Sequence, residues 1–211
     1  FGPDGLSARL KDCEPVLVIL DPKKSELASS TDTETLIADD EFLSDLEAYK
    51  NTYVTSTTSA DMAMYQYTSG TSRELPEAVK HRHRAVVTVM IAALYATGVR
   101  PGDKYMCPSS PAWGHGLWHG TLAPLALGIE ISTYAGKFDP EKLLAAMEKF
   151  KITNLSAAAT HYRLMRNISH PKKYSLTLKK LSFTGEPLDT ETALWARQIF
   201  GHDVCSIYGS T

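Results

Sequence analysis

Hydrophobic and polar positions along the chain form two recurring patterns. Short apolar runs rich in Val, Ile, Leu, Met and Tyr stop at turn-forming residues such as Asp21-Pro22, which is typical of buried strands. Longer stretches space their apolar residues three and four apart and stop near glycine or proline, which is typical of helices. The first pattern predicts strands over residues 16–20, 62–67, 104–107, 129–133, 152–156, 180–184 and 203–207. The second predicts helices over residues 6–12, 79–98, 115–127, 139–149, 159–168 and 189–200.

The order of these elements indicates the fold class. From residue 104 onward, predicted strands and helices alternate repeatedly. Since a helix is the usual crossover between parallel strands, this order predicts an α/β fold with a mostly parallel sheet flanked by helices. Residues 25–60 are rich in Ser, Thr, Asp and Glu, and we expect them to form a surface excursion with one short helix near residues 40–49.

Composition narrows the possible classes of protein. The chain has 211 residues, 43% of them hydrophobic, which suits one large globular domain or a piece of a larger one. A net charge of −2 favours neither nucleic acid nor an anionic membrane as a partner, and no apolar run approaches the ~18 residues of a membrane span. The cysteines are far apart and form no CxxC spacing, so we expect reduced thiols and a cytoplasmic location.

Hydroxyl side chains crowd the start of the stretch YTSGTSRELPEAVKH, residues 67–81, between a predicted strand and a predicted helix. Amide and hydroxyl groups in such a loop, next to the positive end of a helix, can bind phosphate, and Arg73 and Lys80 can offset its charge. On composition alone, a surface turn that caps a helix is the more ordinary interpretation. The candidate phosphate-binding residues with small side chains are Thr68, Ser69, Gly70, Thr71 and Ser72.

This stretch resembles the phosphate loop of the AMP-forming acyl-CoA synthetases, which belong to the adenylate-forming ligase superfamily. The pattern of that family runs Thr-Ser-Gly-Thr-Thr-Gly-x-Pro-Lys-Gly-Val, with a histidine soon after. Residues 68–72 match it, as do Pro76 and Val79, and a histidine follows at position 81 or 83. The resemblance implies that the loop binds the phosphates of ATP and that Thr71 contacts Mg²⁺.

The same loop departs from the family pattern at two charged positions. Arg73 stands in place of a glycine, and the stretch is longer by one residue before Pro76. Glu77 stands in place of the family's lysine, and a carboxylate there repels a triphosphate unless it turns away. Arg73 or Lys80 could supply the missing positive charge.

A second stretch, SSPAWGHGLWHGTLAPLALG, residues 109–128, resembles the segment that lines the carboxylic-acid pocket of the family. The resemblance implies that Trp113 lies beside the acid and that Gly114, His115 and Gly116 border it. The plainer interpretation of the tryptophan is a core aromatic. His115 and His119 could face one way on a helix, but no third metal ligand is evident beside them.

A third stretch, SFTGEPLD, residues 182–189, resembles the strand-to-loop Gly-Glu-Pro-Leu of the family, whose backbone lies against the adenine of the nucleotide. The resemblance implies nucleotide contacts from Gly185, Glu186 and Pro187. The plainer interpretation of Glu186 is a carboxylate at the entry to the following helix.

A fourth stretch, VCSIYGST, residues 204–211, resembles the Tyr-Gly-x-Thr-Glu segment of the family. The resemblance implies that the ring of Tyr208 packs on adenine beside Gly209 and that Thr211 contacts the α-phosphate, although Tyr208 could also be a core residue. Relatives that specialise in acetate place a tryptophan at or just before the glycine. Residues 206–210 contain no tryptophan, so acids larger than acetate are expected.

Together these stretches resemble, in order, part of the large AMP-binding domain of an acid–CoA ligase. The implied reaction activates a carboxylic acid with ATP and Mg²⁺ as an acyl-adenylate and transfers it to coenzyme A, as in fatty acid metabolism. We expect no catalytic residue within 1–211, because the adenylation lysine belongs to a small C-terminal domain, and we expect this piece alone to be inactive. An alternative is a nucleotide- or acyl-binding module that no longer adenylates; a third is a structural domain. The protein could assemble as a homo-oligomer.

Overall fold

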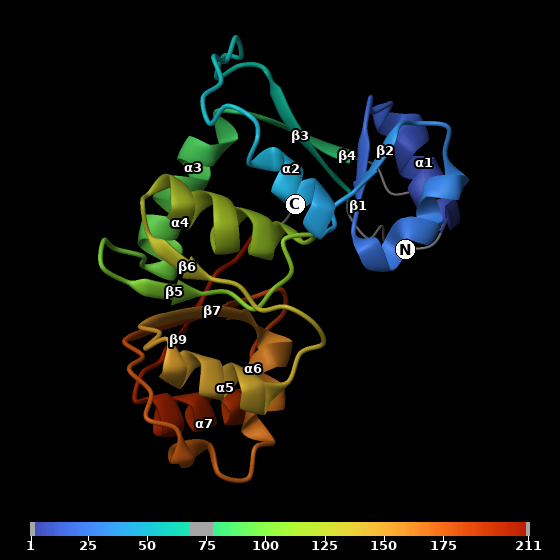
Figure 1. The fold of residues 1–211 in the computed structure, drawn as a ribbon. Coiled ribbons are helices and arrows are strands. Elements are labelled where there is room, and N and C mark those ends of the chain that lie inside the picture. Colours follow the sequence, from blue (N-terminus) through green and yellow to red (C-terminus); the bar gives the residue numbers. More distant parts are fainter. Residues whose placement is uncertain (1–2, 68–77, 210–211) are drawn as a thin grey trace. The chain divides into compact units, whose positions relative to one another are not determined.

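The computed structural model describes residues 3–67 and 78–209 and divides into two compact units, residues 1–82 and 83–211 (Figure 1). The larger unit holds a five-stranded parallel sheet in the order β6-β5-β7-β8-β9. The fold class expected from the sequence, α/β with a mostly parallel sheet, is therefore confirmed. The strands are β5 Lys104–Met106, β6 Glu130–Ser132, β7 Asn154–Ala158, β8 Lys180–Thr184 and β9 Val204–Ser206.

Helices cover both faces of this sheet (Figure 1). One group, α5, α6 and α7, lies together on one face, and α3 and α4 lie on the other. The helical segments of this unit are α3 Ala85–Ala92, η2 Ala93–Thr97, η3 His115–Leu122, α4 Ala123–Ala126, α5 Pro140–Lys149, α6 Ala159–Arg166, η4 Pro171–Lys173 and α7 Thr190–Phe200.

The period of two in the strands separates two cores. In β5, Tyr105 packs with Ala93 and Ala123 on the α3 and α4 face, whereas Met106 packs with the residues of the α5, α6 and α7 face. The interior also contains a polar side chain from β7. Asn154 is fully buried, and its Nδ2 donates to the Thr97 carbonyl oxygen at 3.0 Å. This bond joins β7 to η2 through the interior.

The alternate positions of β7 and β8 differ sharply in chemistry. Leu155, Leu181 and Phe183 join the apolar cluster beneath α5, α6 and α7. Ser156 and Ser182 are buried between them in the sequence, and the Ser182 hydroxyl donates to Ser156 Oγ at 2.9 Å. One face of these two strands is thus apolar, and the other carries a hydrogen-bonded polar row.

The smaller unit consists of two separate strand pairs with a small apolar cluster. β1 and β2 pair in parallel, β3 and β4 pair antiparallel, and the cluster contains Leu6, Leu20 and Leu27. Residues 25–60 contain more regular structure than the single short helix we expected, since most of η1 and all of β2 fall within them and Leu27 is buried. The elements are α1 Pro3–Cys13, β1 Val18–Leu20, η1 Pro22–Ser30, β2 Thr35–Ile37, α2 Asp40–Leu46, β3 Met62–Tyr67 and β4 Ala78–Arg82.

The predicted helix over residues 79–98 is wrong at its start. Residues 78–82 form β4, which pairs with β3 so that Tyr65 lies opposite Lys80, and helix α3 begins only at Ala85. The neighbouring strand supplies backbone partners to this segment, and that pairing overrides the helical pattern. Lys80 is therefore a strand residue, with its Nζ 5.2 Å from the centre of the Tyr65 ring.

Candidate functional site

Three of the segments singled out in the sequence follow the carboxyl ends of parallel strands in the larger unit. Residues 109–116 follow β5, residues 185–187 follow β8, and residues 208–209 follow β9. Parallel strands place their carboxyl ends at one edge of the sheet, and open α/β sheets bind ligands outside that edge where the strand order reverses. Here the order reverses between β5 and β7, so the segment after β5 borders that point.

His115 anchors the segment after β5 to the sheet. Its Nδ1 lies 3.0 Å from Ser109 Oγ, and its Nε2 lies 2.9 Å from Ser156 Oγ in β7. Burial, together with the nearby His119 and His161, lowers the pKa of His115 to about 4. The imidazole is therefore neutral near pH 7, and both of its nitrogens are engaged by hydroxyl groups of the protein.

Gly116 allows helix η3 to approach the preceding loop closely. A Cβ atom at this position would lie 2.2 Å from the Ser110 carbonyl oxygen and 2.4 Å from that of Ser109. The missing side chain thus serves a contact within the protein, and contact of Gly116 with an acid stays a prediction. Trp113, in contrast, is 58% exposed, so it is not a core aromatic. Gly114 lies between them, partly buried.

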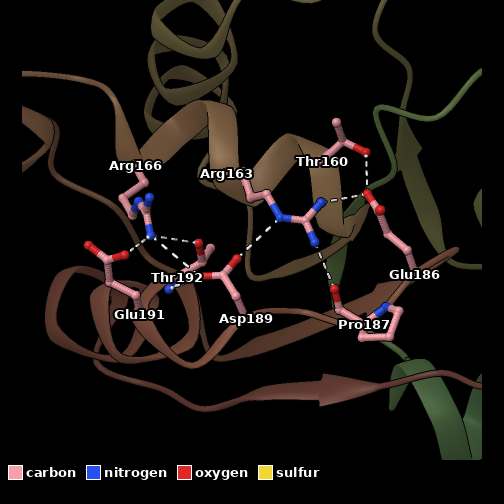
Figure 2. A network of polar contacts seen from close by, with 8 residues as sticks. All are labelled: Thr160, Arg163, Arg166, Glu186, Pro187, Asp189, Glu191 and Thr192. Atoms are coloured by element: carbon pink, nitrogen blue, oxygen red, sulfur yellow. Dashed lines mark hydrogen bonds and ion pairs between the residues drawn. The ribbon is translucent and has the colours of Figure 1, made fainter.

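Residues 185–187, in the loop after β8, are exposed, and helix α6 donates hydrogen bonds to Glu186 and Pro187. Gly185 has a φ of +96°, a left-handed conformation that favours glycine. Glu186 Oε1 accepts hydrogen bonds from Arg163 at 2.6 Å and from Thr160 Oγ1 at 3.0 Å (Figure 2). The Arg163 guanidinium and the Thr160 hydroxyl lower the pKa of Glu186. Arg163 also donates to the Pro187 carbonyl oxygen at 2.7 Å.

The segment after β9 leaves an aromatic ring free of the core. Tyr208 is 99% exposed, and an added Cβ at Gly209 would meet no atom of the described residues within 4 Å. The preceding Ile207 is buried, and its N–H donates to the Phe183 carbonyl oxygen at 2.8 Å. Among the described residues, none covers the Tyr208 side chain, and its stacking on adenine stays a prediction.

The family comparison matches the whole chain. Residues 1–211 match the sequence model of the AMP-binding enzyme family. The chain belongs to this family. An uncharacterized acyl–CoA ligase of Bacillus subtilis, YtcI, is 32% identical over 157 residues, which make up 74% of this chain and 30% of that protein. An acetyl-coenzyme A synthetase of the same organism is 29% identical over 143 residues, 66% of this chain and 25% of that protein.

Solved structures agree with this membership in the AMP-binding enzyme family at the level of the fold. An acyl-CoA synthetase of Brucella canis superposes with a TM-score of 0.86 at 24% identity, over 97% of this chain and 40% of that one. The chain thus spans a third or less of the two curated relatives and two fifths of this structure.

Several predicted site residues of this AMP-binding chain lie outside the described residues or in the other unit. Residues 68–73, which include Thr68, Ser69, Gly70, Thr71, Ser72 and Arg73, are not described, and neither is Thr211. Lys80 lies in β4 of the smaller unit. Within residues 3–67 and 78–209, no three His, Cys, Asp or Glu side chains form a group that could hold a metal ion, although the His115 and His119 rings are 6.2 Å apart. The same ranges contain no helix long and apolar enough to cross a bilayer.

Sequence reasoning missed the side chains that support the predicted segments. Arg163 and Thr160 hold the loop after β8, and Ser109, Ser156 and Ser182 form a row of hydroxyls with His115. The one available signal was polar residues inside strands that otherwise read as fully apolar. The partners themselves are far apart along the chain.

Proposed function

We propose that the protein containing this chain is an AMP-forming carboxylic acid–CoA ligase. The observation that carries the proposal is the position of three segments of this AMP-binding chain at the carboxyl edge of one parallel sheet. A carboxylate oxygen of the substrate attacks the α-phosphorus of ATP, the bond to pyrophosphate breaks, and an acyl-adenylate forms. The thiol of coenzyme A then takes the acyl group, and AMP leaves.

The proposed nucleotide contacts come from loops at this edge and from the phosphate loop. The exposed backbone of residues 185–187 lies against adenine, and the ring of Tyr208 stacks on it. Residues 68–73 bind the phosphates, with Thr71 toward Mg²⁺, and Lys80 and Thr211 add further contacts. If Mg²⁺ is bound, Thr71 would hold it, and the ion would offset the negative charge of the phosphates.

The proposed acid contacts come from the segment after β5. Trp113 supplies an exposed aromatic surface, and Gly114 and Gly116 shape the backbone beside it. His115 is neutral and hydrogen-bonded through both nitrogens, so its role is to hold this wall in place rather than to abstract a proton. A displacement at phosphorus needs no protein nucleophile, because positioning and charge stabilisation supply the catalysis.

Acid-dependent exchange of radiolabelled pyrophosphate into ATP by the full-length protein tests this proposal. We expect exchange only when a carboxylic acid is present. Tyr208→Ala is expected to raise the KM for ATP about tenfold, because base–aromatic stacking contributes ~1–3 kcal/mol. Tyr208→Phe keeps the ring and serves as the matched control. A wild-type protein that binds ATP without exchange would instead be a nucleotide-binding module, the alternative function.

The open environment of Gly209 predicts acids larger than acetate. No atom of residues 3–67 and 78–209 lies within 4 Å of an added Cβ there, and the sequence of residues 206–210 contains no tryptophan. Each buried methylene contributes ~0.8 kcal/mol, so kcat/KM should rise about fourfold per carbon until the pocket is full. A kinetic series from acetate to octanoate measures this, with Gly209→Trp expected to shift the preference toward acetate and Gly209→Ala as the smaller control. If the wild type has its highest kcat/KM with acetate, the prediction is contradicted. One relative, from B. subtilis, carries the name acetyl-coenzyme A synthetase.

The setting of the enzyme is also a proposal. We place the reaction in the cytoplasm, within fatty acid metabolism, where ATP and coenzyme A are available. The cysteines support a reducing environment, since Cys13, Cys107 and Cys205 are all free thiols. A homo-oligomer is compatible with this activity, and the mass of the full-length protein in solution measures it.

A further inference from the structure

Helix α6 presents three polar side chains to the loop between β8 and α7. Thr160, Arg163 and Arg166 are spaced three apart, so they follow one side of the helix, and Figure 2 shows them directed toward residues 186–192. Two of them are arginines whose charge meets three carboxylates on that loop and on the start of α7. This face of α6 is thus devoted to one neighbouring segment.

Arg163 contacts the loop at three separate points. Its Nη1 lies 2.6 Å from Glu186 Oε1, its Nη2 donates to the Pro187 carbonyl oxygen at 2.7 Å, and its Nε donates to Asp189 Oδ2 at 3.1 Å. The contacts involve a side chain, a backbone carbonyl and a second side chain in succession. Because the guanidinium is planar and rigid, three simultaneous contacts fix both the position and the orientation of this loop.

The two ends of the loop are fixed by other means. At the first end, Gly185 leaves β8 in a left-handed conformation. At the second end, Asp189 caps α7 by accepting a hydrogen bond from the Thr192 N–H at 2.9 Å, and Arg166 lies 3.4 Å from the same carboxylate. The middle of the loop, Glu186 and Pro187, has no regular secondary structure, and Arg163 holds both residues.

Fold stability alone accounts poorly for such a network. The Arg163 and Glu186 side chains are 35% and 47% exposed, and ion pairs at exposed positions contribute little to the free energy of unfolding. A pair elsewhere in the same unit, Arg197 with Asp203, makes one ion-pair contact at 3.4 Å, which is the pattern of an ordinary surface pair. Arg163 makes short contacts with two successive residues, Glu186 and Pro187, and a requirement for a defined backbone conformation of this loop explains these contacts better.

We propose that Arg163 is a positioning residue that holds the backbone of residues 185–187 in the conformation that receives the adenine of ATP. This inference rests on the proposed function, since adenine binding by the loop is part of it. In this proposal Arg163 acts on ATP binding through its hydrogen bonds to the loop and not through direct contact with the nucleotide. Its loss therefore weakens binding of ATP and leaves binding of the carboxylic acid unchanged.

The test uses pyrophosphate exchange by the full-length protein with Arg163→Ala, Arg163→Lys and the control Arg197→Ala. We expect Arg163→Ala to raise the KM for ATP on the order of tenfold, because displaced binding groups lose productive geometry, with the KM for the acid and the Tm little changed. Arg163→Lys keeps the charge but loses the planar fork, so it should recover the KM for ATP only in part. Arg197→Ala should behave as the wild type.

Hydrogen–deuterium exchange over residues 185–189 is the second readout, and we expect it to quicken in Arg163→Ala and not in Arg197→Ala. If the wild type exchanges pyrophosphate and Arg163→Ala has an unchanged KM for ATP, the inference is overturned while the proposed function stands. A raised KM without faster amide exchange would overturn it too, since the effect would not pass through the loop. A full-length wild type without acid-dependent exchange would overturn the proposed function and this inference with it.

Discussion

Gly116→Ala is expected to lower the free energy of unfolding of the full-length protein by about 3 kcal/mol, the upper part of the range for overpacked interiors. The new Cβ would lie 2.2 Å from one backbone carbonyl oxygen and 2.4 Å from the next, at Ser110 and Ser109. Backbone atoms cannot rotate away as a side chain can, so the start of η3 must move off the loop after β5. Urea denaturation of wild type and variant measures the loss.

Gly120→Ala is the matched control, because Gly120 lies four residues further along the same buried helical segment. Both substitutions gain similar helix propensity and similar restriction of the unfolded chain. At Gly120 the added Cβ would meet the Cys107 side chain at 2.9 Å, and a side chain can yield. The expected order is therefore a larger loss at position 116. Equal losses, or a stabilised Gly116→Ala, would show that the loop after β5 adapts without cost.

Acidification from pH 6.5 to pH 4 is expected to destabilise the protein through His115. Burial holds the folded-state pKa near 4, below the ~6.5 of an unfolded histidine, so the unfolded state binds more protons between these values. The contribution of His115 is complete above pH 6.5 and is lost as the pH falls toward 4. A shift of this size corresponds to at most ~3 kcal/mol.

His115→Gln isolates this contribution, because an amide can still bond the hydroxyls of Ser109 and Ser156 but does not titrate. His119 and His161, whose pKa values burial also lowers, remain in both proteins, so the difference reports the titration of His115 together with its coupling to them. The measurement is the difference between the free energies of unfolding at pH 7 and pH 4. The same pH dependence in variant and wild type would mean that His115 is protonated without penalty.

The strand and helix patterns predicted the larger unit well, because each element there obeys its local periodicity. The pattern failed at residues 78–82, where pairing with the antiparallel strand β3 decides the conformation of the backbone. Helical spacing over 79–98 could not reveal that partner. Long-range pairing of this kind overrides local preference.

The sequence predicted which segments contribute to the candidate site, but not the contacts that hold these segments in place. Resemblance located Glu186 and His115, and parallel pairing brings their segments to one edge of the sheet. The resemblance could not show that Arg163 of α6 forms a hydrogen bond with Glu186, or that Ser156 of β7 forms one with His115. These partners are joined by packing across the sheet, which one-dimensional spacing does not encode.

The unequal faces of β7 and β8 have a consequence for how freely this chain can vary. Under α5, α6 and α7 the contacts of Leu155, Leu181 and Phe183 are non-directional, so other apolar side chains of similar volume can replace them at small cost. On the opposite face Ser156 Oγ bonds both Ser182 Oγ and His115 Nε2, so exchanging Ser156 for an apolar residue removes this partner from both groups. Substitutions should therefore be tolerated more readily on the apolar side of these two strands than at Ser156 on the other side.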